Sequence, residues 1–240
     1  MKIRPEDRYN RNTNTITCKE QDKLSESCVA VVGLGGLGGG VTELLARTGV
    51  GTLILIDGDR FDATNLNRQL LSRENLIGVP KAEAAADRVF AINSSVRVTP
   101  IKAFLTDENA ADLVRGANIV VDCLDTIDAR FILQDAARTL AIPLVSGAIA
   151  GVSGQVTVMF PDDPGFELIY GARQKGGTTG AEPARGIETR TGNISYCAAL
   201  IASFQASETV KVLLNRGDIL RNRLLIADLW SNTVETMTLL

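Results

Sequence analysis

The chain has 240 residues, of which 25 are Lys or Arg and 28 are Asp or Glu, and its formal net charge is −3 at neutral pH. This balance provides no overall positive field that would attract nucleic acid. Histidine is absent, which excludes Ser-His-Asp and Cys-His catalysis and any metal held by histidine.

The length fits one α/β domain over residues 1–240. Residues 1–8 are too polar for a signal peptide, and no apolar run reaches the roughly 18 to 20 residues of a membrane span. We therefore expect a cytoplasmic protein. The four cysteines stand alone, with no CxxC pair, so no structural zinc site is expected.

From residue 28 the chain alternates between strands and helices, after an N-terminal arm and helix over residues 1–25. Short apolar runs predict buried parallel strands, and the runs between them predict helices capped by Gly49, by Pro80 and by Asp125 or Thr126. This alternation predicts a Rossmann-like, doubly wound, mostly parallel sheet. The expected strands are 28–32, 53–56, 96–101, 119–121 and 144–146, and the expected helices are 36–48, 80–92, 110–114 and 127–140.

After residue 146 the pattern changes. Residues 155–160 alternate as in a half-exposed strand, and residues 171–192, rich in Gly, Thr and charge, predict a mobile loop. Residues 193–214 form a long apolar helix, and residues 224–226 and 233–239 form a closing antiparallel pair. We therefore expect an antiparallel C-terminal extension of the sheet.

A glycine motif, Gly33-Leu34-Gly35-Gly36-Leu37-Gly38, joins the first strand to its helix. Glycines here let backbone N–H groups and the helix N-terminus approach a phosphate. Asp57 ends the next strand, about 20 residues on, where an acid binds ribose hydroxyls. The pattern favours an adenosine nucleotide, and the alternative is a glycine turn used only for packing.

Three polar residues after Asp57 help to distinguish an ATP site from an NAD site. Asn65, Arg68 and Lys81 offer an amide, a planar fork and a compact point charge, which suit a polyphosphate. The alternative is a solvated loop with ordinary surface charges. Asp125 follows the fourth strand, where a carboxylate near phosphates would hold Mg²⁺ or cap a helix.

In this order, the motifs resemble those of the ubiquitin-activating-type adenylation family, in its ThiF/MoeB/HesA branch. The resemblance covers nearly the whole chain. Its motifs here are Arg8-Tyr9-Asn10-Arg11, Gly33 to Gly38, Asp57-Gly58-Asp59, Asn65 to Gln69, Pro80-Lys81-Ala82, Asp122 to Asp125 with Arg130, Ser146-Gly147 and Gly154-Gln155-Val156.

The resemblance implies a chemistry. A small β-grasp, ubiquitin-like carrier ending in Gly-Gly presents its C-terminal carboxylate to ATP and Mg²⁺. The carboxylate attacks the α-phosphorus, giving an acyl-adenylate and pyrophosphate, and a sulfur nucleophile then attacks the anhydride. No enzyme base is needed because the carboxylate is already ionised.

The resemblance also implies roles for residues. Asp57 binds the ribose and Asp59 belongs to the same nucleotide site, together with the glycines of the motif. Asn65, Arg68 and Lys81 hold phosphates and stabilise the transition state, and Asp125 coordinates Mg²⁺. Arg11 reaches the phosphates of a neighbouring subunit, which implies a homodimer, and residues 171–192 form a crossover loop over the carrier's tail.

Two departures from the family pattern concern cysteine. The two zinc-binding CxxC pairs of many members are missing, and residues 171–192 contain no cysteine for a covalent intermediate. The nearest is Cys197, in an apolar helix, for which a buried inert thiol is favoured. We therefore expect adenylation here, with sulfur supplied by a separate donor.

Three other functions remain open. A dehydratase that adenylates threonylcarbamoyl-modified tRNA fits the same polar run, but the chain has no basic face or tail for tRNA. An NAD-dependent oxidoreductase has support from the glycine motif and Asp57 alone. A non-catalytic partner of an activating enzyme would not need Arg68, Lys81 and Asp125.

Overall fold

A computed structural model describes residues 5–12, 14–173 and 191–240. Eight strands form one sheet in the order β3-β2-β1-β4-β5-β6-β7-β8, which confirms the predicted fold class. The strands are β1 (Cys28–Val32), β2 (Thr52–Ile56), β3 (Arg97–Ile101), β4 (Ile119–Asp122), β5 (Leu144–Ala150), β6 (Ser153–Met159), β7 (Arg223–Asp228) and β8 (Thr233–Thr238).

The first five strands are parallel and the last three are antiparallel additions. Val31 of β1 lies opposite Leu55 of β2 on one side and Val121 of β4 on the other. Strand order reverses between β1 and β4, which is the point where open α/β sheets bind ligands. Beyond β5, each of β6, β7 and β8 pairs antiparallel with its predecessor, as the sequence predicted.

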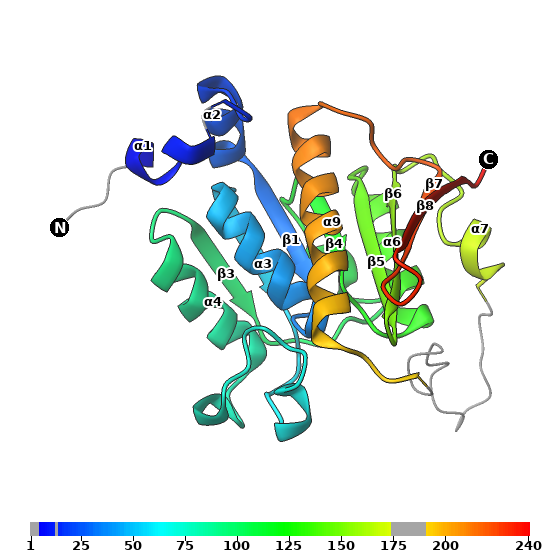
Figure 1. Cartoon of the computed structure of the whole chain (residues 1–240), viewed down its shortest axis with the longest axis horizontal. Helices are drawn as coiled ribbons and strands as arrows, with labels where there is room; N and C mark the ends of the chain where they lie inside the picture. Colours follow the sequence, from blue (N-terminus) through cyan, green and yellow to red (C-terminus); the bar gives the residue numbers. More distant parts are fainter. Residues whose placement is uncertain (1–4, 13, 174–190) are drawn as a thin grey trace.

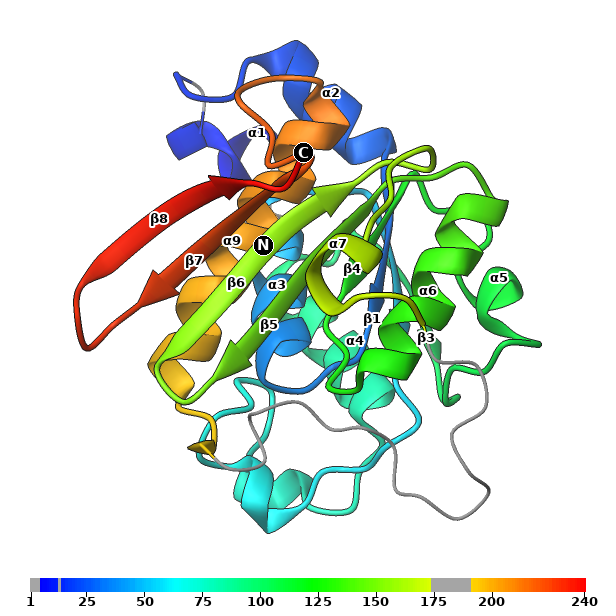
Figure 2. The same cartoon turned by 90° about the vertical axis from the view of Figure 1, so that its right-hand side faces the viewer.

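Helices cover both faces of the parallel strands (Figures 1 and 2). One face carries α3, α4 and α9, and the other carries α5 and α6. The helices are α1 (Pro5–Arg8), α2 (Cys18–Glu26), α3 (Gly36–Thr48), α4 (Lys81–Ile92), α5 (Ala110–Leu113), α6 (Ile127–Thr139), α7 (Glu167–Tyr170) and α9 (Ser195–Leu214), with single 3₁₀ turns η1 (Asn10–Asn12), η2 (Ala63–Asn65) and η3 (Glu74–Leu76).

Small residues bring α3 and α9 close together. A Cβ on Gly40 would lie 2.8 Å from Ala202 Cβ, and one on Gly36 would lie 3.6 Å from Ala198 Cβ. These two pairs are spaced four residues apart on each helix, so they share one face. Close packing therefore explains glycine at position 40, outside the nucleotide motif.

The prediction that no apolar run reaches the length of a membrane span is wrong for helix α9. Its mean hydropathy is 1.3 over a helix of 20 residues, so the chain does contain an apolar segment long enough to cross a membrane. Half of that segment is buried inside the fold, where α9 packs against α3 and the sheet. A core helix with neighbours on several sides has this composition without a membrane.

The prediction of a half-exposed strand near residues 155–160 is also wrong. Strand β6 is largely buried, because α9 covers one of its faces and Phe166, beside α7, packs in one cluster with Met159 on the other. Ile201 of α9 occupies the space in which a side chain at Gly154 would lie. The crossover loop expected at 171–192 lies mainly outside the described residues.

Candidate nucleotide site

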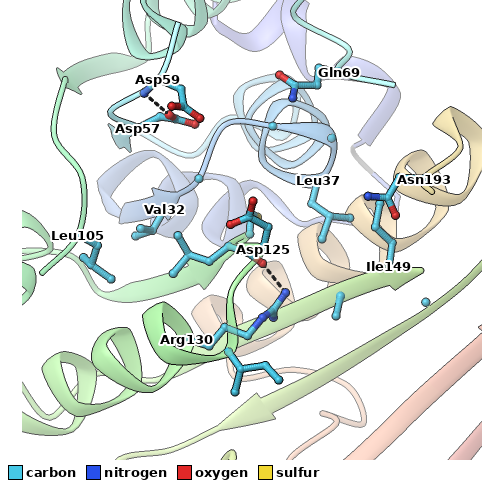
Figure 3. Close-up of a pocket in the computed structure, with 18 of the residues that line it drawn as sticks. Val32, Leu37, Asp57, Asp59, Gln69, Leu105, Asp125, Arg130, Ile149 and Asn193 are labelled. Atoms are coloured by element: carbon cyan, nitrogen blue, oxygen red, sulfur yellow. Dashed lines mark hydrogen bonds between the residues drawn. The ribbon is translucent and has the colours of Figure 1, made fainter. Parts of the chain in front are cut away.

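A cavity of about 600 Å³ opens at the carboxyl ends of β1, β2 and β4. Most of the sequence-predicted residues meet in its wall. Figure 3 shows Asp57 and Asp59 on one side of the view, Asn193 on the other, and Asp125 between them. The predicted residues that line it are Gly33, Gly35, Gly36, Asp57, Asp59, Arg68, Lys81 and Asp125.

The glycine motif forms the wall between β1 and α3. Gly33 has a φ of +87°, and a Cβ there would lie 2.7 Å from the Cys123 carbonyl oxygen, so only glycine fits without strain. Gly36 and Leu37, at the N-terminus of α3, also line the cavity, and the N-terminus of a helix suits an anion. Gly38 does not line the cavity. A Cβ there would lie 1.8 Å from the Gly33 carbonyl oxygen, so this glycine serves helix–strand packing.

Asp57 ties the end of β2 to the glycine loop. One carboxylate oxygen accepts a hydrogen bond from the Leu34 N–H at 2.7 Å, and the other accepts one from the Asp59 N–H at 2.7 Å. The carboxylate therefore orders the loop and still lies at the cavity wall, where it can accept ribose hydroxyls.

Two cations lie on one side of the cavity. Lys81 begins α4, is 6% exposed, and places its ammonium 3.1 Å from an Asp59 carboxylate oxygen. The guanidinium of Arg68 donates to the Thr64 carbonyl at 2.9 Å and to Asn67 Oδ1 at 3.0 Å. Both cations can neutralise phosphate charge with small side-chain movements.

Asn65 does not line the cavity, contrary to expectation. Its Oδ1 accepts from the Asp62 N–H at 3.2 Å and completes a capping box around η2. A short amide side chain in a loop bonds readily to nearby backbone, and here it does so. Asn65 therefore shapes the loop that carries Arg68.

Arg11 also lies outside the cavity. It is exposed in η1, and its neighbour Tyr9 packs against Gly49 at the C-terminal end of α3 and accepts a hydrogen bond from Asn93 Nδ2 at 2.8 Å. The cavity is at the other end of α3, about 20 Å away at 1.5 Å per residue. Arg11 therefore cannot contact a nucleotide in its own chain.

Asp125 offers a carboxylate for a cation. It lines the cavity, and no donor in the described part of the chain bonds to its carboxylate. No cluster of three metal-binding side chains occurs among the described residues. One free carboxylate beside a phosphate site fits Mg²⁺, which is usually held by one or two carboxylates plus substrate oxygens.

The turn after β4 rests on a buried ion pair. Arg130 donates to Asp122 Oδ2 at 2.7 Å and to the Gly147 carbonyl at 2.9 Å, and it also bonds the Leu124 carbonyl. Ser146 donates to the same Asp122 oxygen at 2.6 Å. Burial raises the pKa of Asp122, and the Arg130 guanidinium opposes this shift. Asp122 is thus a structural residue of this turn.

Several cavity residues were missed by sequence reasoning. Gln69, 7% exposed, has an amide oxygen without a hydrogen-bond partner among the described residues. Gln155 donates to Tyr170 Oη at 3.0 Å, and with Ile226 these residues extend the wall across the antiparallel strands. Gln69, Arg130 and Gln155 stood in the quoted motifs, so the signal was present without a role attached.

Residues 9–239 match the model of the ThiF family. The chain belongs to the ThiF family.

Curated relatives of this ThiF-family chain cover most of its length. It is 35% identical to the SAMP-activating enzyme E1 of Haloferax volcanii, over 96% of this chain and 84% of that protein. It is 33% identical to the molybdopterin-synthase adenylyltransferase of Salmonella typhimurium, over 92% and 87%. It is 35% identical to the sulfur carrier protein adenylyltransferase of Thermus thermophilus, over 92% and 83%.

A solved structure shares the fold. The crystal structure of E. coli MccB with ATP superposes with a TM-score of 0.78 at 22% identity, over 98% of this chain and 72% of that one. This chain therefore shares its overall fold with that structure.

Thiol chemistry is weakly supported in this ThiF-family chain. Cys197 is 1% exposed within α9 and does not line the cavity. Burial raises the pKa of its thiol, and burial together with Asp122 raises that of Cys123. A thiol must ionise to attack an acyl-adenylate, so both cysteines are poor nucleophiles at neutral pH.

Proposed function

We propose that this chain is an ATP-dependent adenylyltransferase that activates the C-terminal carboxylate of a small ubiquitin-like sulfur carrier. One observation carries the proposal. A single cavity joins a glycine loop at a helix N-terminus to Asp57, Arg68, Lys81 and Asp125, in a ThiF-family chain whose relatives are named as activating enzymes and adenylyltransferases.

Each residue of the site has a role in the proposed reaction that follows from its charge. The glycine loop and the α3 N-terminus receive phosphate oxygens, and Asp57 accepts the ribose hydroxyls. Arg68 and Lys81 neutralise charge that builds up as pyrophosphate leaves. Asp125 would hold Mg²⁺, which would supply positive charge to stabilise the phosphates.

The carrier supplies its own nucleophile. Its C-terminal carboxylate is ionised at neutral pH, so attack on the α-phosphorus forms the acyl–phosphate bond and breaks the bond to pyrophosphate without an enzyme base. A chain without histidine can catalyse this step through positioning and electrostatics. Sulfur then comes from a separate donor, since neither Cys123 nor Cys197 ionises readily.

The cavity leads to an exposed sheet surface that suits the carrier. Ile226 of β7 lines the cavity and is 39% exposed, and the neighbouring hairpin exposes Trp230 and Met237 by 79% and 51%. Exposed apolar groups of this size support protein contacts. A narrow tail ending in Gly-Gly would pass Gln155 and Tyr170 to reach the phosphates.

A homodimer would bring Arg11 to a nucleotide. Arg11 is exposed, and the nearby Tyr9 packs against Gly49 at the end of α3 remote from the cavity. A contact with phosphate therefore requires a second copy of the chain. We also propose that the reaction takes place in the cytoplasm.

The decisive experiment is carrier-dependent exchange of radiolabelled pyrophosphate into ATP. Each small Gly-Gly-ending protein of the source organism is tested, with the same protein lacking its last glycine as the matched control. We expect Mg²⁺-dependent exchange with one intact carrier and none with its truncated form. Absence of exchange with every carrier would refute the proposal. ATP turnover with tRNA instead would support the alternative function, a tRNA dehydratase.

A further inference from the structure

A buried glutamine of α9 contacts the turn that carries Asp125. Gln205 is fully buried, and its Nε2 donates to the Asp122 carbonyl at 2.7 Å. Its Oε1 lies 3.8 Å from the Cys123 thiol, within hydrogen-bond distance for sulfur. One carboxamide therefore bonds to two successive residues of the turn.

The space for this carboxamide comes from Gly147 in β5. A Cβ at position 147 would lie 2.4 Å from the carboxamide carbon of Gln205. Glycine at this position therefore admits the glutamine. The backbone conformation of Gly147 does not require glycine, because its φ is not positive.

Other polar groups of the turn are also bonded. Asp122 Oδ1 accepts from the Leu124 N–H at 2.9 Å, and the Cys123 N–H donates to the Val32 carbonyl at 2.9 Å. Arg130 bonds the Leu124 carbonyl from the α6 side, while Gln205 bonds the Asp122 carbonyl from the α9 side. The turn is thus held from both faces of the sheet, and the next residue is Asp125.

We propose that Gln205 is a positioning residue, which fixes the β4 turn so that the Asp125 carboxylate meets the metal–nucleotide complex. The inference rests on the proposed role of Asp125. Partners that orient a metal ligand typically change metal affinity by 10- to 100-fold when removed. Loss of the Gln205 bonds should therefore weaken metal binding in the cavity, beyond any effect on folding.

The test measures Mn²⁺ affinity by electron paramagnetic resonance, on the full chain with a non-hydrolysable ATP analogue. Gln205→Met keeps the length of the side chain but removes both polar atoms, and Gly147→Ala displaces the carboxamide without changing it. We expect each to weaken Mn²⁺ binding about 10-fold and to raise the Mg²⁺ concentration for half-maximal exchange. Their double variant should lose less than the product of the two effects, because both act on one contact.

Glu208→Gln is the matched control. Glu208 lies one turn further along α9, is 3% exposed, and accepts from the Leu220 N–H at 2.9 Å, away from the cavity. This variant should lower stability without changing Mn²⁺ affinity.

Unchanged Mn²⁺ affinity in Gln205→Met and Gly147→Ala would overturn the positioning role. If the wild-type chain shows no exchange with any carrier, but the two variants still weaken Mn²⁺ binding, the proposed function fails and the positioning role stands.

Discussion

The Lys81 ammonium lies 3.1 Å from the Asp59 carboxylate at the edge of the cavity. Lys81 is 6% exposed, so Asp59 provides the countercharge for a largely buried cation. Nucleotide phosphates would compete with Asp59 for this ammonium. Asp59 therefore bears on the reaction through Lys81, in addition to any direct nucleotide contact.

Removal of Lys81 or Arg68 should impair adenylation. Lys81→Ala and Arg68→Ala are each expected to lower carrier-dependent exchange by at least about 10²-fold, the scale for one charge-stabilising donor. Asp59→Asn should have a smaller effect in the same assay, because the lysine remains. Lys102→Ala is the control, since Lys102 is exposed and pairs with Glu83 outside the cavity wall. Near-normal exchange in Lys81→Ala or Arg68→Ala would show that the residue does not stabilise the reaction as proposed.

Removal of the Asp125 carboxylate should abolish both activity and the response to Mg²⁺. Exchange would be measured against Mg²⁺ concentration for Asp125→Ala and for Asp112→Asn, a change at an exposed carboxylate of α5 that pairs with Arg115. Residual exchange in Asp125→Ala should be at least about 10²-fold lower and flat with Mg²⁺. If exchange in Asp125→Ala depended on Mg²⁺ concentration as in the wild type, the metal would have to be bound by other groups.

Arg11 should act across a dimer interface. Arg11→Ala and Lys81→Ala are each expected to be inactive, but a mixture that exchanges subunits should recover roughly a quarter of wild-type exchange, because half of the dimers are mixed and each has one intact site. A mixture of Arg68→Ala with Lys81→Ala is the control. Neither variant changes Arg11, and Arg68 and Lys81 belong to the same cavity. Each site of a mixed dimer therefore lacks one of these two cations, and no activity should be recovered. Equal recovery in both mixtures, or none in the first, would contradict the trans role.

Cys197→Ser should leave adenylation within about twofold of wild type, because Cys197 is buried and outside the cavity wall. Mass spectrometry after iodoacetamide treatment at neutral pH should find label on the exposed Cys18 and none on Cys197 until the chain unfolds. A large loss of exchange, or rapid labelling of Cys197, would reopen a covalent role.

The α3–α9 contact should be sensitive to one methyl group. Gly40→Ala would place a Cβ 2.8 Å from that of Ala202, which should lower the free energy of unfolding by about 1–3 kcal/mol. Urea unfolding of Gly40→Ala, Ala202→Gly and the double variant would measure the coupling. We expect Ala202→Gly to relieve part of the loss, and strictly additive effects would show that the helices adjust elsewhere.

The predicted residues that line the cavity share a local signal. Gly33, Asp57 and Lys81 stand at the ends of strands or the start of a helix, and the parallel topology brings such ends to one edge of the sheet. Asn65 and Gly38 carry the same kind of signal but serve a 3₁₀ cap and helix packing. A spacing rule fixes where a residue lies along the chain, and it leaves open which way a side chain turns.

Sequence alone determined the order of strands and helices, the family motifs and the absence of histidine chemistry, because these depend on local periodicity and composition. Tertiary structure decided which motif residues meet in the cavity, that Arg11 lies far from its own site, and that Gln205 bonds the Asp122 carbonyl. Gln205 is a single polar residue in an apolar helix, and its contacts join segments distant in the chain. Such contacts exist only after the sheet and helices have packed.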